Sequence, residues 1–370
     1  MNGAAEPLEA SRTLAGPTVG GDAALSVVVV SPARFANVRR TVHHLRRQTV
    51  RERIELVLVA PTIAALDDAT PHDLAGFHSV TAVAAGPIVD VDRAAAHGLL
   101  RASAPIVGVL EDHAFPEPQW AAAQLAAHHG PWGAVGSAMV NANPGGALSW
   151  ANLVLAYGAW MHPAPDAEIA TLPGHNITWK REALAPFATS LAERLGRGGT
   201  LLAALRDAGW TLGIAGTARV HHLNPSTWRA TARVRVDAGR LYAAERARRW
   251  GVVRRLLFAS GSPLIPLVRY ARVRHVAFAR GRMPATWPMR AGLVAALVFD
   301  ACGQCLGYLA GAGASRARLC RFELDRLPHL TAADRRALDA VPGDDVATHR
   351  WPVAVAAVTA PPVAAAVEPG

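Results

Sequence analysis

The chain has 370 residues, of which 51% are hydrophobic and 18% charged, so it is too apolar for a disordered protein and long enough for a large core. A net charge of +10 favours anionic partners such as nucleic acid, anionic lipid or phosphorylated substrates. Three clustered cysteines (302, 305 and 320) exclude a disulfide framework. No basic start followed by an apolar core opens the chain, so we expect a cytoplasmic protein without a cleaved signal.

Both ends of the chain are rich in Gly, Ala and Pro and lack periodicity. We therefore expect residues 1–24 to be disordered and residues 336–370 to form a low-complexity tail. Folded structure is predicted between about residue 25 and about residue 335.

Strands and helices alternate through the first third of this folded part. Short β-branched runs at 25–30, 54–60, 80–85 and 105–112 are typical of strands buried on both faces. Apolar residues spaced by three and four from Phe35 to Leu45 predict a helix after the first strand, and a second helix is expected at 91–102. This order predicts an α/β fold with a mostly parallel, doubly wound sheet, in which ligands bind at the carboxyl ends of the strands.

The fourth strand ends on Glu111, Asp112 and His113. Two carboxylates and an imidazole at a strand end would repel a nucleotide diphosphate unless a divalent cation lay between them. Oxygen ligands with one imidazole suit Mn²⁺ or Mg²⁺. The alternative is that Asp112 caps the following helix near Glu117 and that His113 is solvated.

Several motifs occur in an order that resembles a family 2 glycosyltransferase of the GT-A fold over roughly residues 25–228. The nucleotide half is similar in the stretch SVVVVSPARFANVRRTVHHLRRQTVRERIELVLVAP, and the segment before the acidic triplet is similar in DRAAAHGLLRASAPIVGVLEDH. Two later stretches, LPGHNITWKREAL and LLAALRDAGWTLGIAGTARVHHLNPSTW, look like the acceptor segment and the late helix and strand.

The resemblance implies a nucleotide-sugar donor and assigns roles to particular residues. Ser31 and Pro32 fall in the nucleotide half, Arg93 and Asp112 on donor-binding positions, and Glu111 to His113 on the metal motif. His221 would complete the metal site at the end of its strand. His222 is the alternative, because neighbours on a strand point to opposite faces and only one can reach the site. Both histidines could instead be ordinary core or surface residues.

Three departures from the family pattern concern catalysis and specificity. Ala60, Pro61 and Thr62 follow the second strand, where relatives carry an acid that reads the base, and the stretch after the first strand is reduced to SPAR. Arg197 and Gly198 replace the acidic pair that supplies the general base. Glu193 or His175 is predicted to act instead; the alternatives are a solvated helix face for Glu193 and a turn contact for His175.

Residues 229–335 are predicted to form a basic amphipathic and apolar helical region. Fifteen arginines and no lysine lie between residues 228 and 290. A 23-residue segment without Lys or Arg (291–313) follows, and it contains Asp300 and Gln304. This order favours a peripheral element on an anionic membrane surface at the cytoplasmic face, in which 291–313 is a helix that packs on the domain or dips into the interface. A single transmembrane anchor at 291–313 is the alternative. The C-x-x-C at Cys302 and Cys305 lacks a second pair for zinc, and chance accounts for it better.

Two classes of function remain open from the sequence. The first is a metal-assisted glycosyltransferase that acts on an unknown glycan or lipid-linked acceptor. The second is a non-catalytic protein of the same fold that serves as a partner in glycan assembly. Nucleic-acid binding is disfavoured, because the basic region lacks a recognisable nucleic-acid motif.

Overall fold

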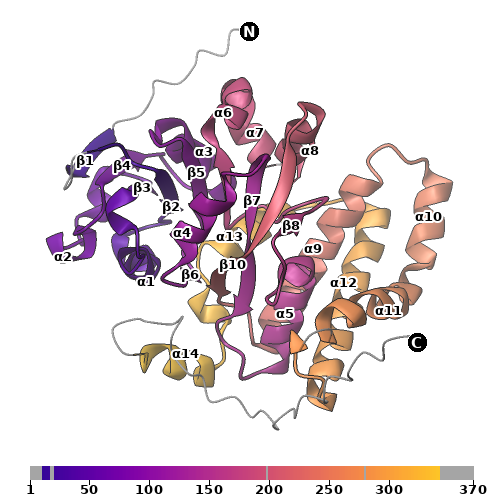
Figure 1. Cartoon of the computed structure of the whole chain (residues 1–370). Helices are drawn as coiled ribbons and strands as arrows, with labels where there is room; N and C mark the ends of the chain where they lie inside the picture. The colour runs from indigo at the N-terminus through magenta and orange to yellow at the C-terminus, as the bar shows by residue number, and fades with distance from the viewer. Residues whose placement is uncertain (1–10, 17–20, 197–198, 279–280, 342–370) are drawn as a thin grey trace, which may run out of the picture.

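The computed structural model describes residues 11–16, 21–196, 199–278 and 281–341, and these form an α/β fold on a mixed ten-stranded sheet (Figure 1). The strands are, in chain order, β1 (Ser11–Ala15), β2 (Leu25–Val30), β3 (Ile54–Ala60), β4 (Ser79–Ala84), β5 (Ile106–Leu110), β6 (Ala114–Pro116), β7 (Trp132–Asn141), β8 (Ala167–Glu168), β9 (Ile177–Lys180) and β10 (Thr211–His222). Across the sheet the order is β1-β4-β3-β2-β5-β9-β7-β10-β6, with β8 paired to β10.

Helices flank the sheet and continue beyond it (Figure 1). They are α1 (Phe35–Arg46), α2 (Pro71–Leu74), α3 (Val91–Arg101), α4 (Trp120–Ala127), α5 (Ala147–Tyr157), α6 (Arg181–Leu184), α7 (Leu191–Leu195), α8 (Thr200–Asp207), α9 (Trp228–Arg246), α10 (Val252–Ser260), α11 (Ile265–Phe278), α12 (Trp287–Ala310), α13 (Ser315–Glu323) and α14 (Ala332–Asp339).

The central strands are buried because both faces of the sheet are covered, and the polar residues in them, Ser26 of β2 and Glu55 of β3, hydrogen-bond to each other. Every residue of β2 and β3 is buried, as their continuous apolar runs predict. Val27 and Val29 join the hydrophobic cluster that contains the buried face of α1, whereas Val28 and Val30 join the cluster with α3. The alternation of side chains along a strand thus divides one apolar run between two layers.

The sheet is less parallel than the sequence predicts. Strands β4, β3, β2 and β5 run parallel, and so do β7 and β10. Strand β9, however, lies antiparallel between β5 and β7, and β1, β6 and β8 are antiparallel to their neighbours. The sheet therefore joins two parallel sets through one reversed strand.

Both predicted ends of the folded part need correction. Strand β1 lies within the segment expected to be disordered and pairs antiparallel with β4. Helix α14 extends to Asp339, inside the expected low-complexity tail, and Leu338 packs with Leu223 and Leu330. Residues 342–370 lie outside the described part of the chain.

The C-terminal helices pack closely on one another and on the α/β domain. Glycines of α9 and α12 allow the close approach: a Cβ at Gly303 would lie 2.1 Å from the carbonyl oxygen of Val236. Nearer the start of α12, Gly292 packs against Ala147 of α5. Helix α12 is long and apolar enough to cross a membrane by length and composition, and 50% of its most apolar window is buried in the protein.

Candidate metal centre

The acidic triplet lies just beyond β5, where the chain leaves the sheet, and its first carboxylate is held from several directions. Glu111 is buried, and its Oε2 accepts hydrogen bonds from the Tyr157 hydroxyl at 3.0 Å and from Nδ2 of Asn176 at 2.6 Å. The same Asn176 accepts from the backbone N–H of Glu111 at 3.2 Å. These contacts fix the position and the orientation of the carboxylate.

Asn176 holds this position with an unusual backbone conformation. Its φ is +58°, and it is the only non-glycine residue in the described part of the chain with a positive φ. It directly precedes β9. Asparagine tolerates this region better than most residues, and such conformations concentrate at functional sites. The residue just before the reversed strand β9 thus hydrogen-bonds to both the carboxylate and the backbone N–H of Glu111.

His222, at the end of β10, directs its ring at the same carboxylate. Its Nε2 lies 3.3 Å from Oε2 of Glu111, and its Nδ1 lies 2.9 Å from Oδ1 of Asn224. The Asn224 amide nitrogen donates to Oδ1 of Asn141 and to the carbonyl of His222, so Oδ1 of Asn224 must accept from Nδ1–H. In the neutral ring, Nε2 then presents a lone pair to a carboxylate oxygen. Two acceptors at this distance require a proton or a cation between them.

His113 is also oriented through both ring nitrogens. Its Nε2 lies 2.8 Å from a guanidinium nitrogen of Arg326, and its Nδ1 lies 2.6 Å from Oδ1 of Asp112. Because a guanidinium can only donate, Nε2 must accept, and Nδ1–H donates to Asp112. Burial, together with the charge of Arg326, lowers the pKa of His113 well below its usual range. The imidazole is therefore neutral at neutral pH and has a basic Nε2.

Glu111, His113 and His222 together form a buried group that could hold a metal ion, with one ligand atom from each residue within 4.8 Å of the others. Metal-binding histidines generally donate their second ring N–H to a carboxylate or an amide oxygen, which is what Asp112 and Asn224 accept here. Burial alone would raise the pKa of Glu111, but the surrounding histidines, among them the charged His175, lower it well below the usual range. The carboxylate is therefore ionised and available as a ligand.

Asp112 contributes through His113 in this structure. Burial raises the pKa of the Asp112 carboxyl to about 8, and Arg326 opposes the shift. A divalent cation nearby would favour the ionised form.

A cavity of about 20 Å³ adjoins the group, large enough for one water molecule or one ion. Its lining includes Pro32, Val91, Glu111, His113 and His175. Nδ1 of His175 lies 3.4 Å from Oδ1 of Asp92 on α3. Burial opposes the charging of His175, but Asp92, Glu111 and Glu323 raise its pKa to about 9. An imidazolium already holds its proton, so at neutral pH His175 suits the stabilisation of negative charge better than general-base catalysis.

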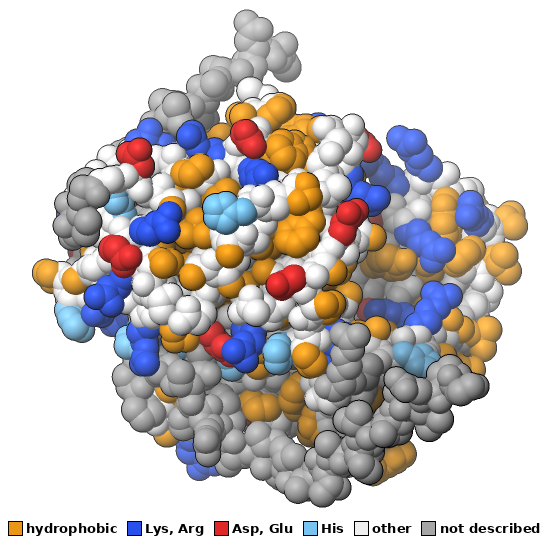
Figure 2. All heavy atoms as spheres, viewed as in Figure 1, with side chains coloured by type: hydrophobic (Ala, Val, Ile, Leu, Met, Phe, Trp, Pro, Cys, Tyr) orange, Lys and Arg blue, Asp and Glu red, His pale blue; other side chains and the backbone are white. Residues whose placement is uncertain are grey.

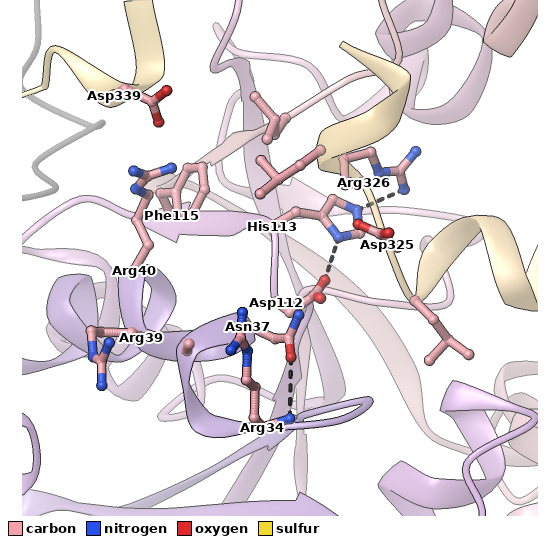
Figure 3. A pocket seen from close by; sticks show the side chains of 14 residues that line it. Arg34, Asn37, Arg39, Arg40, Asp112, His113, Phe115, Asp325, Arg326 and Asp339 are labelled. Atoms are coloured by element: carbon pink, nitrogen blue, oxygen red, sulfur yellow. Dashed lines mark hydrogen bonds and ion pairs between the residues drawn. The ribbon is translucent and has the colours of Figure 1, made fainter. Parts of the chain in front are cut away.

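A larger cavity of about 330 Å³ opens beside Asp112 and His113, at the lower end of the range of small-molecule sites. Figure 3 shows Arg34, Arg39 and Arg40 on the side of α1 and Arg326 on the C-terminal segment. Three aspartates, Asp112, Asp325 and Asp339, also line this cavity. Arginines from two distant parts of the sequence thus surround one space next to the candidate metal ligands.

The structure brings most of the predicted donor and metal residues to this edge of the sheet. Ser31 is buried and donates to the carbonyl of Arg34 at 2.6 Å, at the turn that enters α1. Arg93 lies one residue after Asp92, with its side chain exposed on α3. Glu193 is exposed on α7, which packs on α3.

The assignment of His221 to the metal site requires correction. Its Nε2 lies 3.0 Å from Oε1 of Glu117 instead. Because His221 and His222 are adjacent on β10, their side chains point to opposite faces, and His222 takes the place next to Glu111. Arg197 and Gly198, where the family carries its acidic pair, lie outside the described residues.

Other residues of the site were missed by the sequence analysis: Tyr157, Asn176, Asn224, Glu323 and Arg326. Asn176 lies within the quoted LPGHNITWKREAL motif, so its position was noticed but not its role. Arg326 is 213 residues from His113 and is buried against it. No local pattern could have connected these two residues.

No protein-family model matches this chain, and no curated protein matches it. The resemblance to family 2 glycosyltransferases therefore rests on the order of the motifs in the sequence.

Proposed function

We propose that the chain is a metal-assisted glycosyltransferase of the GT-A type, which transfers a sugar from a nucleoside-diphosphate sugar to a glycan or lipid-linked acceptor. One observation carries the proposal: a buried carboxylate and two oriented imidazoles, Glu111, His113 and His222, lie beside a cavity lined by arginines. This combination suits a divalent cation that is shared with a diphosphate.

The ligand set bears on which metal would bind. Two imidazole nitrogens with one carboxylate oxygen favour Mn²⁺ or another transition metal over Mg²⁺, which prefers oxygen ligands. When bound, the metal would stabilise the negative charge of the departing diphosphate. Asp112 and Asn224 would orient the two histidines, and Arg34, Arg39, Arg40 and the charged His175 would bind phosphate oxygens.

The test is thermal stabilisation of the full chain by nucleoside diphosphates and nucleotide sugars, with and without Mn²⁺. We expect an increase in Tm that requires both ligand and metal and that a chelator removes; a ligand at about 100 times its Kd contributes roughly 2.7 kcal/mol. Asp112→Asn should weaken metal affinity roughly 10- to 100-fold, because a neutral amide replaces the carboxyl that contacts Nδ1 of His113 and that a bound cation would favour in its ionised form.

Asp325→Asn is the matched control, since Asp325 lines the same cavity and is exposed. It should leave metal affinity close to that of the unmodified chain. Nucleotide binding that is independent of metal, or equal metal affinities in the two variants, would contradict the proposal. Release of nucleoside diphosphate in the presence of acceptor would then measure turnover.

A second candidate function is that of a non-catalytic partner in glycan assembly. It is favoured by the state of the predicted bases: Glu193 is exposed on α7, and His175 is protonated at neutral pH. Metal-dependent binding of a nucleotide sugar without release of diphosphate would favour this function over catalysis.

We also propose that the protein binds the cytoplasmic face of an anionic membrane through α10 and α11. Val253 and Leu267 on these helices are 83% and 71% exposed. Arginine side chains lie among hydrophobic ones on the right-hand part of Figure 2, where Figure 1 places α10. Each basic residue near such a surface adds about 1 kcal/mol, which salt screens.

High salt or alkaline carbonate should therefore release the protein from membranes that contain anionic lipid. Sedimentation with vesicles before and after the salt wash measures this release. Recovery only in detergent, with α12 protected from aqueous labelling, would contradict peripheral binding and favour a spanning helix.

A further inference from the structure

A cavity of about 780 Å³ lies among the C-terminal helices α9 to α12, on elements separate from the strand ends that form the metal site. Arginines project into it from α9 and α11, and Asp300 and Gln304 line it from α12. Its mouth is apolar and includes Leu257 and Leu264.

The charge of this cavity is unbalanced. Its lining contains four arginines (235, 246, 269 and 272) and a single carboxylate, Asp300. Asp300 is buried; it forms an ion pair with Arg269 and accepts from Nε2 of Gln304 at 2.7 Å. The one carboxylate is thus already bound by two partners.

Arg235 is the cation that this arrangement leaves without a full partner. Among the described residues, its Nε is buried and has no hydrogen-bond partner. Burial lowers the pKa of Arg235 to about 10, which indicates how unfavourable the buried charge is, although Asp300 opposes the shift. A charged guanidinium with a buried, unpaired N–H normally requires a hydrogen-bond acceptor and a counter-charge, and an anionic group in the cavity would supply both.

The walls near the mouth are exposed and apolar. Leu257 is 66% exposed, Leu264 is 63% exposed and Val268 is 44% exposed, and all three line the cavity. Exposed apolar surface continues from them to Val253 and Leu267 on the outside of α10 and α11. A ligand that fits both the arginine-lined interior and the apolar mouth has an anionic head and a hydrocarbon chain. A free inorganic anion would leave the apolar mouth without a contact.

We propose that this cavity binds one molecule of an anionic membrane lipid, with its phosphate at Arg235 and Arg269 and its chain along Leu257, Leu264 and Val268. The site goes beyond glycosyl transfer, because it uses none of the metal-site residues. It also differs from general attraction to a charged surface, since it predicts one bound lipid per protein molecule and dependence on the half-buried Arg235.

Short-chain dihexanoyl phosphatidylglycerol below its micelle concentration is the probe, because it presents the head and a chain without a bilayer. Calorimetry on the full chain should give one site. Arg235→Gln should weaken binding by about tenfold or more, since a charge-assisted contact is lost. The matched control is Arg249→Gln, which removes the same charge from an exposed residue outside the cavity and should have no effect.

A second pair of variants tests the mouth without altering a buried residue. Leu264→Glu should abolish binding of the soluble lipid, whereas Leu267→Glu, on an exposed residue that does not line the cavity, should preserve it. Absence of binding to the unmodified chain, or equal losses within either pair, would overturn the proposal. Inorganic phosphate that binds as tightly as the lipid would also overturn it, because the hydrocarbon chain of the lipid would then contribute nothing to the affinity.

Discussion

His222→Ala is expected to reduce Mn²⁺ affinity by more than about 100-fold. The effect should exceed that of Asp112→Asn, because His222 is a proposed metal ligand whereas Asp112 only orients one. The ring lies next to Glu111, and its Nδ1–H is already held by Asn224, so its Nε2 is set for coordination. Titration calorimetry of the full chain with Mn²⁺ at neutral pH measures the change. Tyr157 and Asn176 still hold Glu111 in this variant, so the carboxylate should stay in place.

The adjacent histidine provides the control. His221→Ala removes an imidazole that pairs with Glu117 on the other face of β10, and it should leave Mn²⁺ affinity unchanged. Equal losses in the two variants would show that the effect comes from disturbing the strand. Unchanged affinity in His222→Ala would disprove the metal centre as assigned.

The sequence predicted the parallel half of the fold well, because that information is local. The β-branched, mainly apolar runs at 25–30 and 54–60 are typical of strands covered on both faces, and the structure has β2 and β3 there. The reversed strand β9 could not be read in the same way. It has four residues, and its direction is set by its pairing with β5 and β7.

The candidate site shows the same division between local and long-range information. Glu111 to His113 could be recognised because an acidic triplet interrupts an apolar run at a strand end. The choice between His221 and His222 needed only the twofold period of a strand, but the sequence could not say which face looked towards Glu111. Arg326 reaches His113 through the packing of the C-terminal helices, which no motif near either residue encodes.

Asp300 is a carboxylate within an apolar segment, and its local sequence explains only part of why it is tolerated there. A carboxylate within an apolar segment argued against a simple spanning helix. The structure supplies the reason that the segment tolerates it: Asp300 pairs with Arg269 of α11 and with Gln304 one turn later on α12. The spacing of Asp300 and Gln304 was visible, whereas the arginine came from a different helix.

Arg326 occupies the position next to Nε2 of His113 and also forms an ion pair with Glu323. The guanidinium must give up its hydrogen bond before that nitrogen can bind a metal, and a hydrogen bond to a charged group contributes roughly 1.5–3 kcal/mol. Arg326→Met should therefore raise Mn²⁺ affinity by about 10- to 100-fold. The methionine keeps an apolar side chain against Phe322, over whose ring the guanidinium lies, at 4.9 Å from the centroid.

Arg321→Met is the matched control, because Arg321 is exposed on α13 and its loss removes the same charge from the same segment. Its Mn²⁺ affinity should match that of the unmodified chain, and equal thermal midpoints would show that both variants fold. A nucleoside diphosphate titration separates two roles for Arg326. If the arginine also binds donor phosphate, Arg326→Met will bind metal more tightly and nucleotide more weakly. Unchanged or reduced Mn²⁺ affinity in Arg326→Met would show that the guanidinium does not compete with the metal for Nε2 of His113. The metal could then bind Nε2 while Arg326 stays in place.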